Sequence, residues 1–145
     1  MNPHIPEAVN GRLGRVLVVD DEAQVRKPIH LTLSRVGYEV VEAEDGEQAI
    51  RTLNSGDNPL MVDAILCDIR MPKVNGSEAI VYFRSQYPGV PVVVMTGYPD
   101  VELAVALMKQ GVLDYLVKPV SREELLTVVR KAVDQHTVFK DQFTA

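Results

Sequence analysis

The sequence of 145 residues predicts an α/β fold in which a parallel sheet is covered by helices on both faces. Two observations support this prediction. Five short runs rich in Val, Ile and Leu indicate buried strands, and segments with apolar residues at helical spacing lie between them. Strands that alternate with helices are joined by right-handed βαβ crossovers, which make neighbouring strands parallel.

The first half of the chain contains three expected strands and two expected helices. The strands are Arg15–Asp20, Tyr38–Glu42 and Ala64–Asp68, and the helices are Ala23–Val36 and Gly46–Leu53. The second strand alternates between apolar and polar residues, which indicates that one of its faces is less buried. The polar stretch from Asn54 to Pro59 contains glycine and proline and predicts a loop.

The second half continues this alternation. The expected elements are a helix that ends near Ser85, a strand Val90–Thr96, a helix Val101–Gln110, a strand Leu113–Lys118 and a last helix after Ser121. Ser121 and Glu124 have the spacing of a capping box, with Ser121 as the N-cap. The last helix repeats apolar residues at helical spacing, at Leu125, Val128, Val129, Ala132 and Val133.

Composition and charge argue against several classes of function. The net charge of -5 and the lack of a Lys/Arg stripe argue against direct contact with nucleic acid. No apolar run approaches the roughly 18 residues that a membrane span needs, and the N-terminus lacks the regions of a secretory signal. Cys67 is the one cysteine of the chain, so no internal disulfide can form, which is typical of a protein in the reducing cytoplasm.

Three segments are expected along the chain. Residues 1–14 lack periodicity and predict a flexible leader, residues 15–133 form one domain, and residues 134–145 form a C-terminal tail or linker. Within the tail, Phe139 and Phe143 are four residues apart and with Val133 could extend the last helix as an apolar stripe, and a frayed terminus is the alternative. The residues after Val133 are too few for a DNA-binding or enzymatic module. Two interpretations are open: a stand-alone domain, or a fragment of a longer protein that carries an output domain.

Acidic residues follow two of the expected strands. Asp20 and Asp21 end the first strand, and Asp68 ends the third. In an open α/β sheet, ligands bind in the crevice outside the carboxyl ends of the strands, so we expect these carboxylates to meet there. Such a cluster repels itself unless a cation neutralises it, and carboxylate oxygens are suitable ligands for Mg²⁺. The alternative for Asp20 and Asp21 is a favourable negative charge at the N-terminus of the following helix.

A hydroxyl and an ammonium group are expected at the same edge of the sheet. Thr96 ends the fourth strand, and its hydroxyl can donate to a phosphoryl oxygen, although threonine is also common as the last residue of a strand. Lys118 ends the fifth strand and needs an anionic partner if it is buried. The Lys118-Pro119 bond is a candidate for the cis form, which would turn the lysine over the crevice. Carboxylates can act as nucleophiles toward phosphorus, so the whole set predicts phosphoryl chemistry.

These motifs resemble the receiver domain of two-component response regulators, over about residues 15–133. The motifs are, in order, Asp20-Asp21, Asp68 with Met71-Pro72 and Gly76, Thr96-Gly97, and Asp114-Tyr115 before Lys118-Pro119. The resemblance implies a flavodoxin-like (βα)5 fold, a doubly wound parallel sheet with strand order 2-1-3-4-5. The segment Met95–Pro119 is also similar to receivers of nitrogen-regulation-type transcriptional activators, which precede an ATPase module, and this favours the fragment interpretation.

The resemblance also assigns roles to the acidic residues. Asp68 would be the phosphoacceptor, and Asp20 and Asp21 would be the acidic pair that holds Mg²⁺ together with Asp68. The backbone carbonyl of Arg70 would be a further metal ligand. No catalytic position departs from the family pattern.

The remaining roles concern the phosphate and the response to it. Lys118 and Thr96 would contact the phosphate, and Tyr115 would be the switch aromatic that turns inward when Thr96 moves. The helix Val101–Gln110, the strand after it and the last helix form the face that usually contacts an output partner, an output domain or a second copy in a homodimer.

The implied function is a signalling switch, phosphorylated by a histidine kinase or a phosphotransfer protein, that catalyses only its own phosphorylation and dephosphorylation. One alternative is a phosphohydrolase with an aspartyl-phosphate intermediate. Such enzymes usually have a second Asp two residues after the nucleophile, where this chain has Arg70. Another alternative is a flavodoxin-like cofactor binder, but the acidic residues after the first strand would repel a flavin phosphate.

Overall fold

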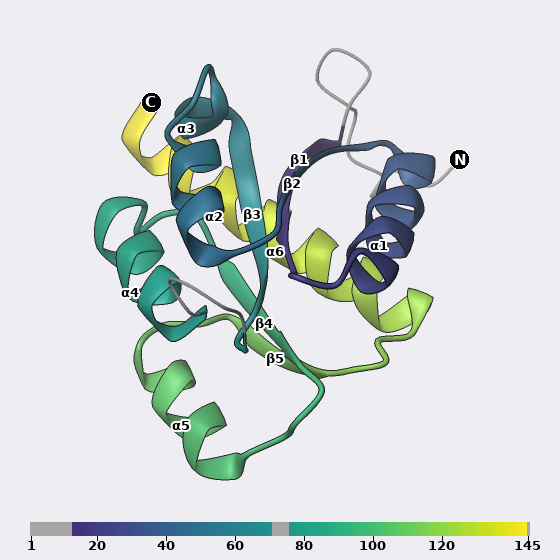
Figure 1. Cartoon of the computed structure of the whole chain (residues 1–145). Coiled ribbons are helices and arrows are strands. Elements are labelled where there is room, and N and C mark those ends of the chain that lie inside the picture. Colours follow the sequence, from purple (N-terminus) through teal and green to yellow (C-terminus); the bar gives the residue numbers. More distant parts are fainter. Residues whose placement is uncertain (1–12, 71–75, 145) are drawn as a thin grey trace.

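Five parallel strands form one sheet in the order β2-β1-β3-β4-β5 (Figure 1). The strands are β1 (Gly14–Val19), β2 (Tyr38–Ala43), β3 (Val62–Asp68), β4 (Val92–Thr96) and β5 (Asp114–Val117). The predicted fold class and strand order are therefore confirmed. The structure, a computed structural model, describes residues 13–70 and 76–144, so most of the expected leader and the pair Met71-Pro72 lie outside the described residues.

Six helices are found in the described part of the chain. They are α1 (Ala23–Val36), α2 (Gly46–Leu53), α3 (Asn58–Met61), α4 (Gly76–Gln86), α5 (Val101–Lys109) and α6 (Arg122–Thr144). The short helix α3 corrects the prediction that residues 54–59 are entirely a loop. Pro59 stands in its first turn, where the fixed φ of proline suits a helix and the missing N–H has no partner to lose. None of these helices, over the residues described, combines the length and apolarity that a membrane crossing requires.

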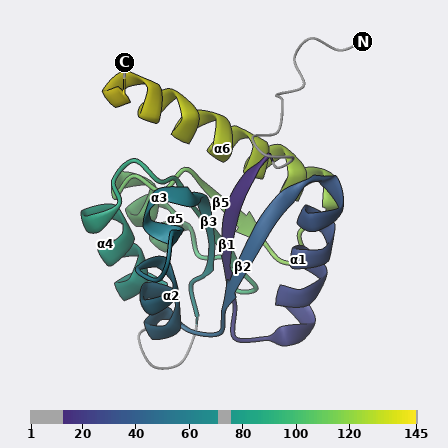
Figure 2. The same cartoon turned by 90° about the horizontal axis from the view of Figure 1, so that it is seen from above.

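The longer helices divide between the two faces of the sheet (Figure 2). Helices α1 and α6 pack on one face, and α2, α4 and α5 pack on the other. Successive strand residues point to opposite faces, so Val16 and Val18 contact the first layer while Leu17 and Val19 contact the second. The central strand β3 is buried along its whole length. Burial of these apolar side chains holds the strands in register and fixes the position of the crevice at their carboxyl ends.

Caps define several helix ends. The hydroxyl of Ser121 accepts a hydrogen bond from the Glu124 amide at 3.1 Å, which confirms Ser121 as the cap of α6. A carboxylate oxygen of Asp100 accepts one from the Leu103 amide at 3.1 Å and begins α5. Gly37 ends α1 with a φ of 115°, a conformation that favours glycine. Each side-chain cap stabilises its helix by about 1 kcal/mol.

Helix α6 continues well beyond Val133, so the segment expected as a tail is helical over its described residues. His136 is buried in this extension, and its Nδ1 atom lies 2.9 Å from Oδ1 of Asp63. Lys140 places its Nζ atom 3.2 Å from the same oxygen. Because Asp63 lies near the amino end of β3, these contacts fasten the extended helix to the end of the sheet opposite the predicted site.

Candidate functional site

The carboxyl ends of β1 and β3 bring the predicted acidic residues together. Asp20, Asp21 and Asp68 each offer one carboxylate oxygen, and these oxygens lie within 4.8 Å of one another. Asp20 is fully buried and Asp68 is 4% exposed, whereas Asp21 is open to solvent. A set of oxygen donors with one open side suits Mg²⁺, which usually keeps several water ligands. The residues present therefore fit this metal.

Two backbone features place Asp68 in the crevice. Its Oδ1 atom accepts a hydrogen bond from the backbone amide of Arg70 at 3.2 Å. Gly76, at the start of α4, lies so close to the same strand that a β-carbon there would collide with the backbone carbonyl of Asp68. Glycine is needed at this position because of the close approach, and this gives the predicted motif residue a structural reason.

Lys118 reaches the acidic cluster from the end of β5. Its Nζ atom lies 2.6 Å from Oδ2 of Asp20 and 3.3 Å from Oδ2 of Asp68. Burial lowers the pKa of Lys118, but the hydrogen bonds and charges of Asp20 and Asp68 outweigh burial and hold this pKa above its usual value. The Lys118-Pro119 peptide bond is cis, as the sequence suggested.

The charge balance around Asp68 is incomplete. Burial raises the pKa of this carboxyl, Lys118 lowers it and the nearby charge of Asp20 raises it again, so that the pKa lies above the usual value of an aspartate. One lysine thus compensates two buried carboxylates only in part. The site has an excess of negative charge that a cation would neutralise.

The predicted hydroxyl and switch residue lie at the ends of β4 and β5. Thr96 is buried, and its Oγ1 atom accepts a hydrogen bond from the Tyr98 amide at 3.0 Å. The Lys118 amide donates to the Thr96 carbonyl at 2.8 Å, which keeps the two strand ends side by side. Tyr115 is half-buried, and its hydroxyl accepts from the amide of Asp100, the residue that caps α5.

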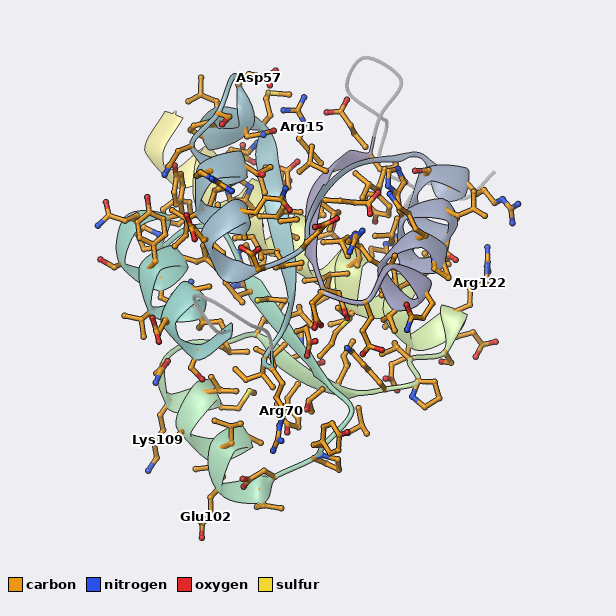
Figure 3. All side chains as sticks on the ribbon, in the orientation of Figure 1. Arg15, Asp57, Arg70, Glu102, Lys109 and Arg122 are labelled. Carbon is orange, nitrogen blue, oxygen red and sulfur yellow. The ribbon has the colours of Figure 1, made fainter. Side chains whose placement is uncertain are left out.

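Arg70 extends toward the β4–α5 connection. Its guanidinium carbon lies 4.7 Å from the centre of the Tyr98 ring. Figure 3 shows Arg70 at the end of the sheet that faces α5, whereas Arg15 and Asp57 lie at the opposite end. The backbone amide of Arg70 reaches Asp68, so the residue spans from the acidic cluster to the segment that follows Thr96.

Arg26 of α1 is a buried residue beside the site that the sequence did not predict. Its Nη1 atom donates to the backbone carbonyl of Asp20 at 2.7 Å, and its Nε atom donates to Glu42 at 2.6 Å. The sequence does contain a pattern that points to this residue. The buried residues of α1 are Arg26, Ile29 and Leu33, which follow helical spacing. A charged residue therefore lies on the apolar stripe of the helix. The partners of that charge come from β2 and could not be read from the pattern of α1.

Comparison with known proteins identifies one family. The response regulator receiver domain matches residues 16–130. Regulatory protein AtoC of Escherichia coli is 35% identical over 129 residues, which cover 89% of this chain and 27% of AtoC. The response regulator MprA of Mycolicibacterium vanbaalenii is 38% identical over 123 residues, which cover 85% of this chain and 52% of MprA. The chain thus spans only about a quarter to a half of the length of these two relatives.

Solved structures show the same fold. A response regulator receiver domain protein from Clostridium thermocellum aligns with a TM-score of 0.81 at 28% identity, over 88% of this chain and 99% of that one. NtrX from Brucella abortus aligns with a TM-score of 0.79 at 26% identity, over 88% of this chain and 29% of that one. Since the family match covers most of the chain and the strand order agrees with it, the chain belongs to the family of response regulator receiver domains.

Proposed function

We propose that this domain is a phosphorylation-activated switch in which Asp68 accepts a phosphoryl group from a histidine kinase or a phosphotransfer protein. The observation that carries the proposal is the surroundings of Asp68, which has two further carboxylates within 4.8 Å and Lys118 Nζ at 3.3 Å. In the transfer, an oxygen of Asp68 would form the new P–O bond while the P–N bond of the donor's phosphohistidine breaks. The imidazole leaves with the electron pair of that bond.

Asp20, Asp21 and Asp68 would hold Mg²⁺ together with the backbone carbonyl of Arg70 and water. Bound there, the cation would neutralise charge on the carboxylates and on the phosphoryl oxygens, which is a main requirement of phosphoryl transfer. The donor set supports this assignment, because it contains only oxygen atoms and has one open side. The raised pKa of Asp68 is consistent with it, since burial and the charge of Asp20 together outweigh the charge of Lys118.

Lys118 and Thr96 would recognise the phosphoryl group once it is attached. Lys118 Nζ already lies between Asp20 and Asp68, so a small movement would bring it to a phosphoryl oxygen. The Thr96 hydroxyl would exchange its hydrogen bond with the Tyr98 amide for one to the phosphate. Hydrolysis of the acyl phosphate at the same site would return the domain to its resting state, so the proposed catalysis is limited to the domain's own phosphorylation and dephosphorylation.

A groove beside Lys118 would accommodate the phosphodonor protein. It has a volume of about 360 Å³ and lies between α1 and the segment after β5. Its walls come mainly from apolar side chains, among them Pro28, Ile29 and Pro119. A partner that places side chains in this groove would lie beside Lys118, whose Nζ atom is 3.3 Å from Asp68.

The output face would be formed by α5, β5 and α6. It exposes apolar side chains at Val105, Met108 and Val117, each between 44% and 48% exposed. Such side chains suit an output partner, an output domain or a second copy of the chain. We assign residues 15–133 to the receiver domain, residues 1–14 to a leader and residues 134–145 to a C-terminal tail or linker, whose first part continues α6 and contacts Asp63 through His136. We expect no direct contact of this domain with nucleic acid.

The proposal is tested by phosphorylation with a small phosphodonor and Mg²⁺, followed by intact-mass measurement. The wild-type protein should gain one phosphoryl group, which hydroxylamine removes because acyl phosphates are labile. Asp68→Asn should gain none. Asp141→Asn is the matched control, since Asp141 is exposed on α6 beside Lys140, which contacts Asp63 at the end of the sheet opposite the site. Equal labelling of Asp68→Asn and the wild type would refute the assignment.

A further inference from the structure

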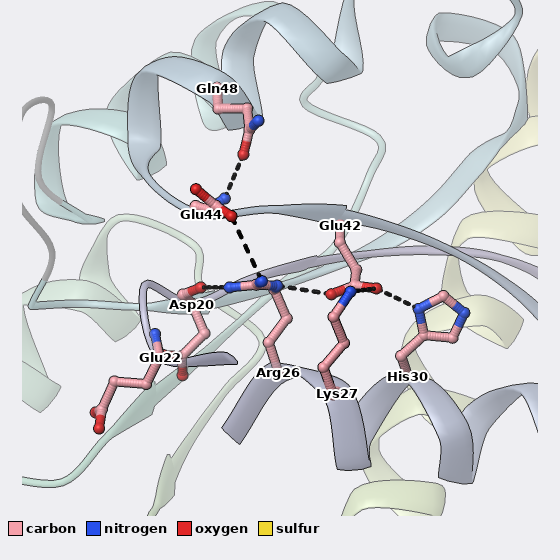
Figure 4. Close-up of polar contacts among 8 residues, drawn as sticks. All are labelled: Asp20, Glu22, Arg26, Lys27, His30, Glu42, Glu44 and Gln48. Atoms are coloured by element: carbon pink, nitrogen blue, oxygen red, sulfur yellow. Dashed lines mark hydrogen bonds and ion pairs between the residues drawn. The ribbon is translucent and has the colours of Figure 1, made fainter. Parts of the chain in front are cut away.

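Arg26 is a buried cation next to the metal site, and the roles assigned above give it no task. Its side chain is 6% exposed. Figure 4 shows the guanidinium between three oxygen atoms that come from different segments. Nη1 donates to the Asp20 carbonyl at 2.7 Å, Nε donates to Glu42 at 2.6 Å, and Nη2 lies 3.7 Å from a carboxylate oxygen of Glu44.

The bond to the Asp20 carbonyl fixes the peptide group between the two acidic residues. The amide of Asp20 donates to the Ala43 carbonyl at 3.1 Å, and its carbonyl accepts from Arg26. The amide of Asp20 is thereby bonded to the end of β2 and its carbonyl to α1. Because a peptide unit is planar, the orientation of this carbonyl sets the direction in which the chain continues to Asp21.

The two acidic side chains differ in how they are held. The Asp20 carboxylate accepts from the Glu22 amide at 2.9 Å and from Lys118 at 2.6 Å. For the exposed Asp21 carboxylate, by contrast, the described residues supply no hydrogen bond or ion pair. Since no side chain among residues 13–70 and 76–144 holds the Asp21 carboxylate, the backbone that Arg26 holds is the described feature that positions it.

The charge of Arg26 is compensated on the side away from the site. Glu42 receives hydrogen bonds from Arg26, from Lys27 at 3.0 Å and from His30 at 2.6 Å. Burial would raise the pKa of Glu42, but these hydrogen bonds lower it to about 2, so that the carboxylate stays charged at neutral pH. Arg26 therefore presents a donor to Asp20 with its charge balanced by Glu42, and repulsion of a bound cation is reduced.

We propose that Arg26 is a positioning residue for the metal site. By holding the carbonyl of Asp20, it orients the Asp20-Asp21 peptide and presents the Asp21 carboxylate to a divalent cation. The inference rests on the proposed binding of Mg²⁺ at this site. An arginine is required because its planar fork donates to a carbonyl and a carboxylate at once, from fixed directions, whereas a lysine offers a single point charge.

The test is a titration of the metal-free protein with Mg²⁺ alone, followed by calorimetry and by the amide chemical shifts of Asp20 and Asp21. The variants are Arg26→Gln and Arg26→Lys, with Lys27→Gln as the matched control. Lys27→Gln removes the same charge from the same helix and also loses a bond to Glu42, but it does not touch Asp20. Because Arg26→Gln loses one charge-assisted hydrogen bond, we expect its Kd for Mg²⁺ to be about tenfold higher than that of the wild type. Arg26→Lys should keep the fold but still bind Mg²⁺ several-fold more weakly than Lys27→Gln.

The outcomes separate this inference from the proposed function. If the wild type binds Mg²⁺ and both Arg26 variants bind within twofold of it, the positioning role is refuted while the metal site stands. Equal weakening by Lys27→Gln would also refute it, because the cause would then be charge or the Glu42 network. If Arg26→Gln does not fold, Arg26→Lys decides alone. A wild type that fails to bind Mg²⁺ would overturn the metal site and, with it, this role.

Discussion

At the scale of single residues, the negative charge of the Asp68 carboxylate is only partly compensated when no metal is bound. Its pKa lies above the usual value, so the folded state binds a proton at Asp68 more tightly than the unfolded chain does. Protonated Asp68 therefore stabilises the folded domain at pH values below the usual pKa of an aspartate. This contribution is lost as the pH rises through the raised pKa of the folded state. At neutral pH the Asp68 carboxylate costs stability.

The raised pKa of Asp68 predicts that Asp68→Asn is more stable than the wild type at neutral pH without Mg²⁺, by about 1 kcal/mol. Lys118 keeps its nearer partner Asp20 in the variant, so no buried charge is left unpaired. Chemical denaturation in a chelating buffer measures the difference. Added Mg²⁺ should reverse the order, because the variant loses a ligand. A metal-free variant that is less stable than the wild type would show that Asp68 is compensated after all.

The residues at the strand ends were predictable because each one follows a buried apolar run, and topology alone brings such ends together. Asp68, Thr96 and Lys118 are found where the sequence placed them, at or directly after their strands. Arg26 was not predictable as a contact of Asp20. The sequence shows that a charged residue lies on the apolar stripe of α1, but its partners depend on how α1 packs against β2 and the end of β1, and this is set by tertiary structure.

At the scale of elements, the segment between β4 and α5 links the site to the proposed output face through two hydrogen bonds. One joins the Thr96 hydroxyl to the Tyr98 amide, and the other joins the Tyr115 hydroxyl to the Asp100 amide. Movement of Thr96 toward a phosphoryl group would break the first bond and change the position of the segment. Tyr115 could then leave its bond at the start of α5 and turn inward. The two states need differ by only a few kcal/mol for one phosphoryl group to shift the population.

This coupling predicts that Thr96→Ala still accepts a phosphoryl group on Asp68 but responds weakly at α5 and β5. The measurement is the set of amide chemical shifts of residues 101–120, recorded with Mg²⁺ and with and without beryllofluoride. The variant should show well under half of the wild-type shifts. Thr127→Ala, an exposed position on α6, should show the full pattern. The full wild-type pattern in Thr96→Ala would mean that the signal leaves the site by another path.

The elements themselves were mostly predictable. The structure differs from the expectation at α3, and at α6 it decides between a helical extension and a frayed terminus. The segment that includes Asn58 and Pro59 has the composition of a loop, yet proline also fits the first turn of a helix, and α3 uses it in this way. Helix α6 continues past Val133 because His136 finds a buried partner, Asp63. That partner lies on β3, a long way back in the sequence, so local periodicity carried no sign of it.

At the scale of the whole molecule, the two ends of the sheet have different tasks. The carboxyl ends of the strands hold the acidic cluster, whose charges are only partly compensated. At the amino end, Asp63 is a buried carboxylate with several donors: the Arg15 amide at 3.0 Å, His136 at 2.9 Å and Lys140 at 3.2 Å. These bonds join the first strand, the central strand and the last helix. Both ends of the sheet are thus held by polar contacts, but the buried carboxylate at the amino end is well compensated, whereas Asp68 at the carboxyl end is not.

The contacts of Asp63 at the amino end of the sheet should make stability depend on pH. Burial raises the pKa of Asp63, but the hydrogen bonds from His136 and the Arg15 amide and the charge of Lys140 outweigh it and hold the pKa below its usual value. The folded state thus favours the ionised carboxylate, and this stability is present above the usual pKa of an aspartate and lost as the pH falls through the lower folded value.

Asp63→Asn should therefore lower the free energy of unfolding by about 2 kcal/mol at neutral pH, since it leaves buried donors with a weaker acceptor. The gap between variant and wild type should narrow steadily as the pH falls below the usual pKa of an aspartate, because the wild type then loses the same charge. Urea denaturation over a series of pH values measures both quantities. Asp141→Asn makes the same change at an exposed position of α6 and should leave the stability within a few tenths of a kcal/mol. If Asp63→Asn behaves like this control at neutral pH, the contacts of Asp63 do not fasten the extended helix, and the extension must be held by its apolar side chains alone.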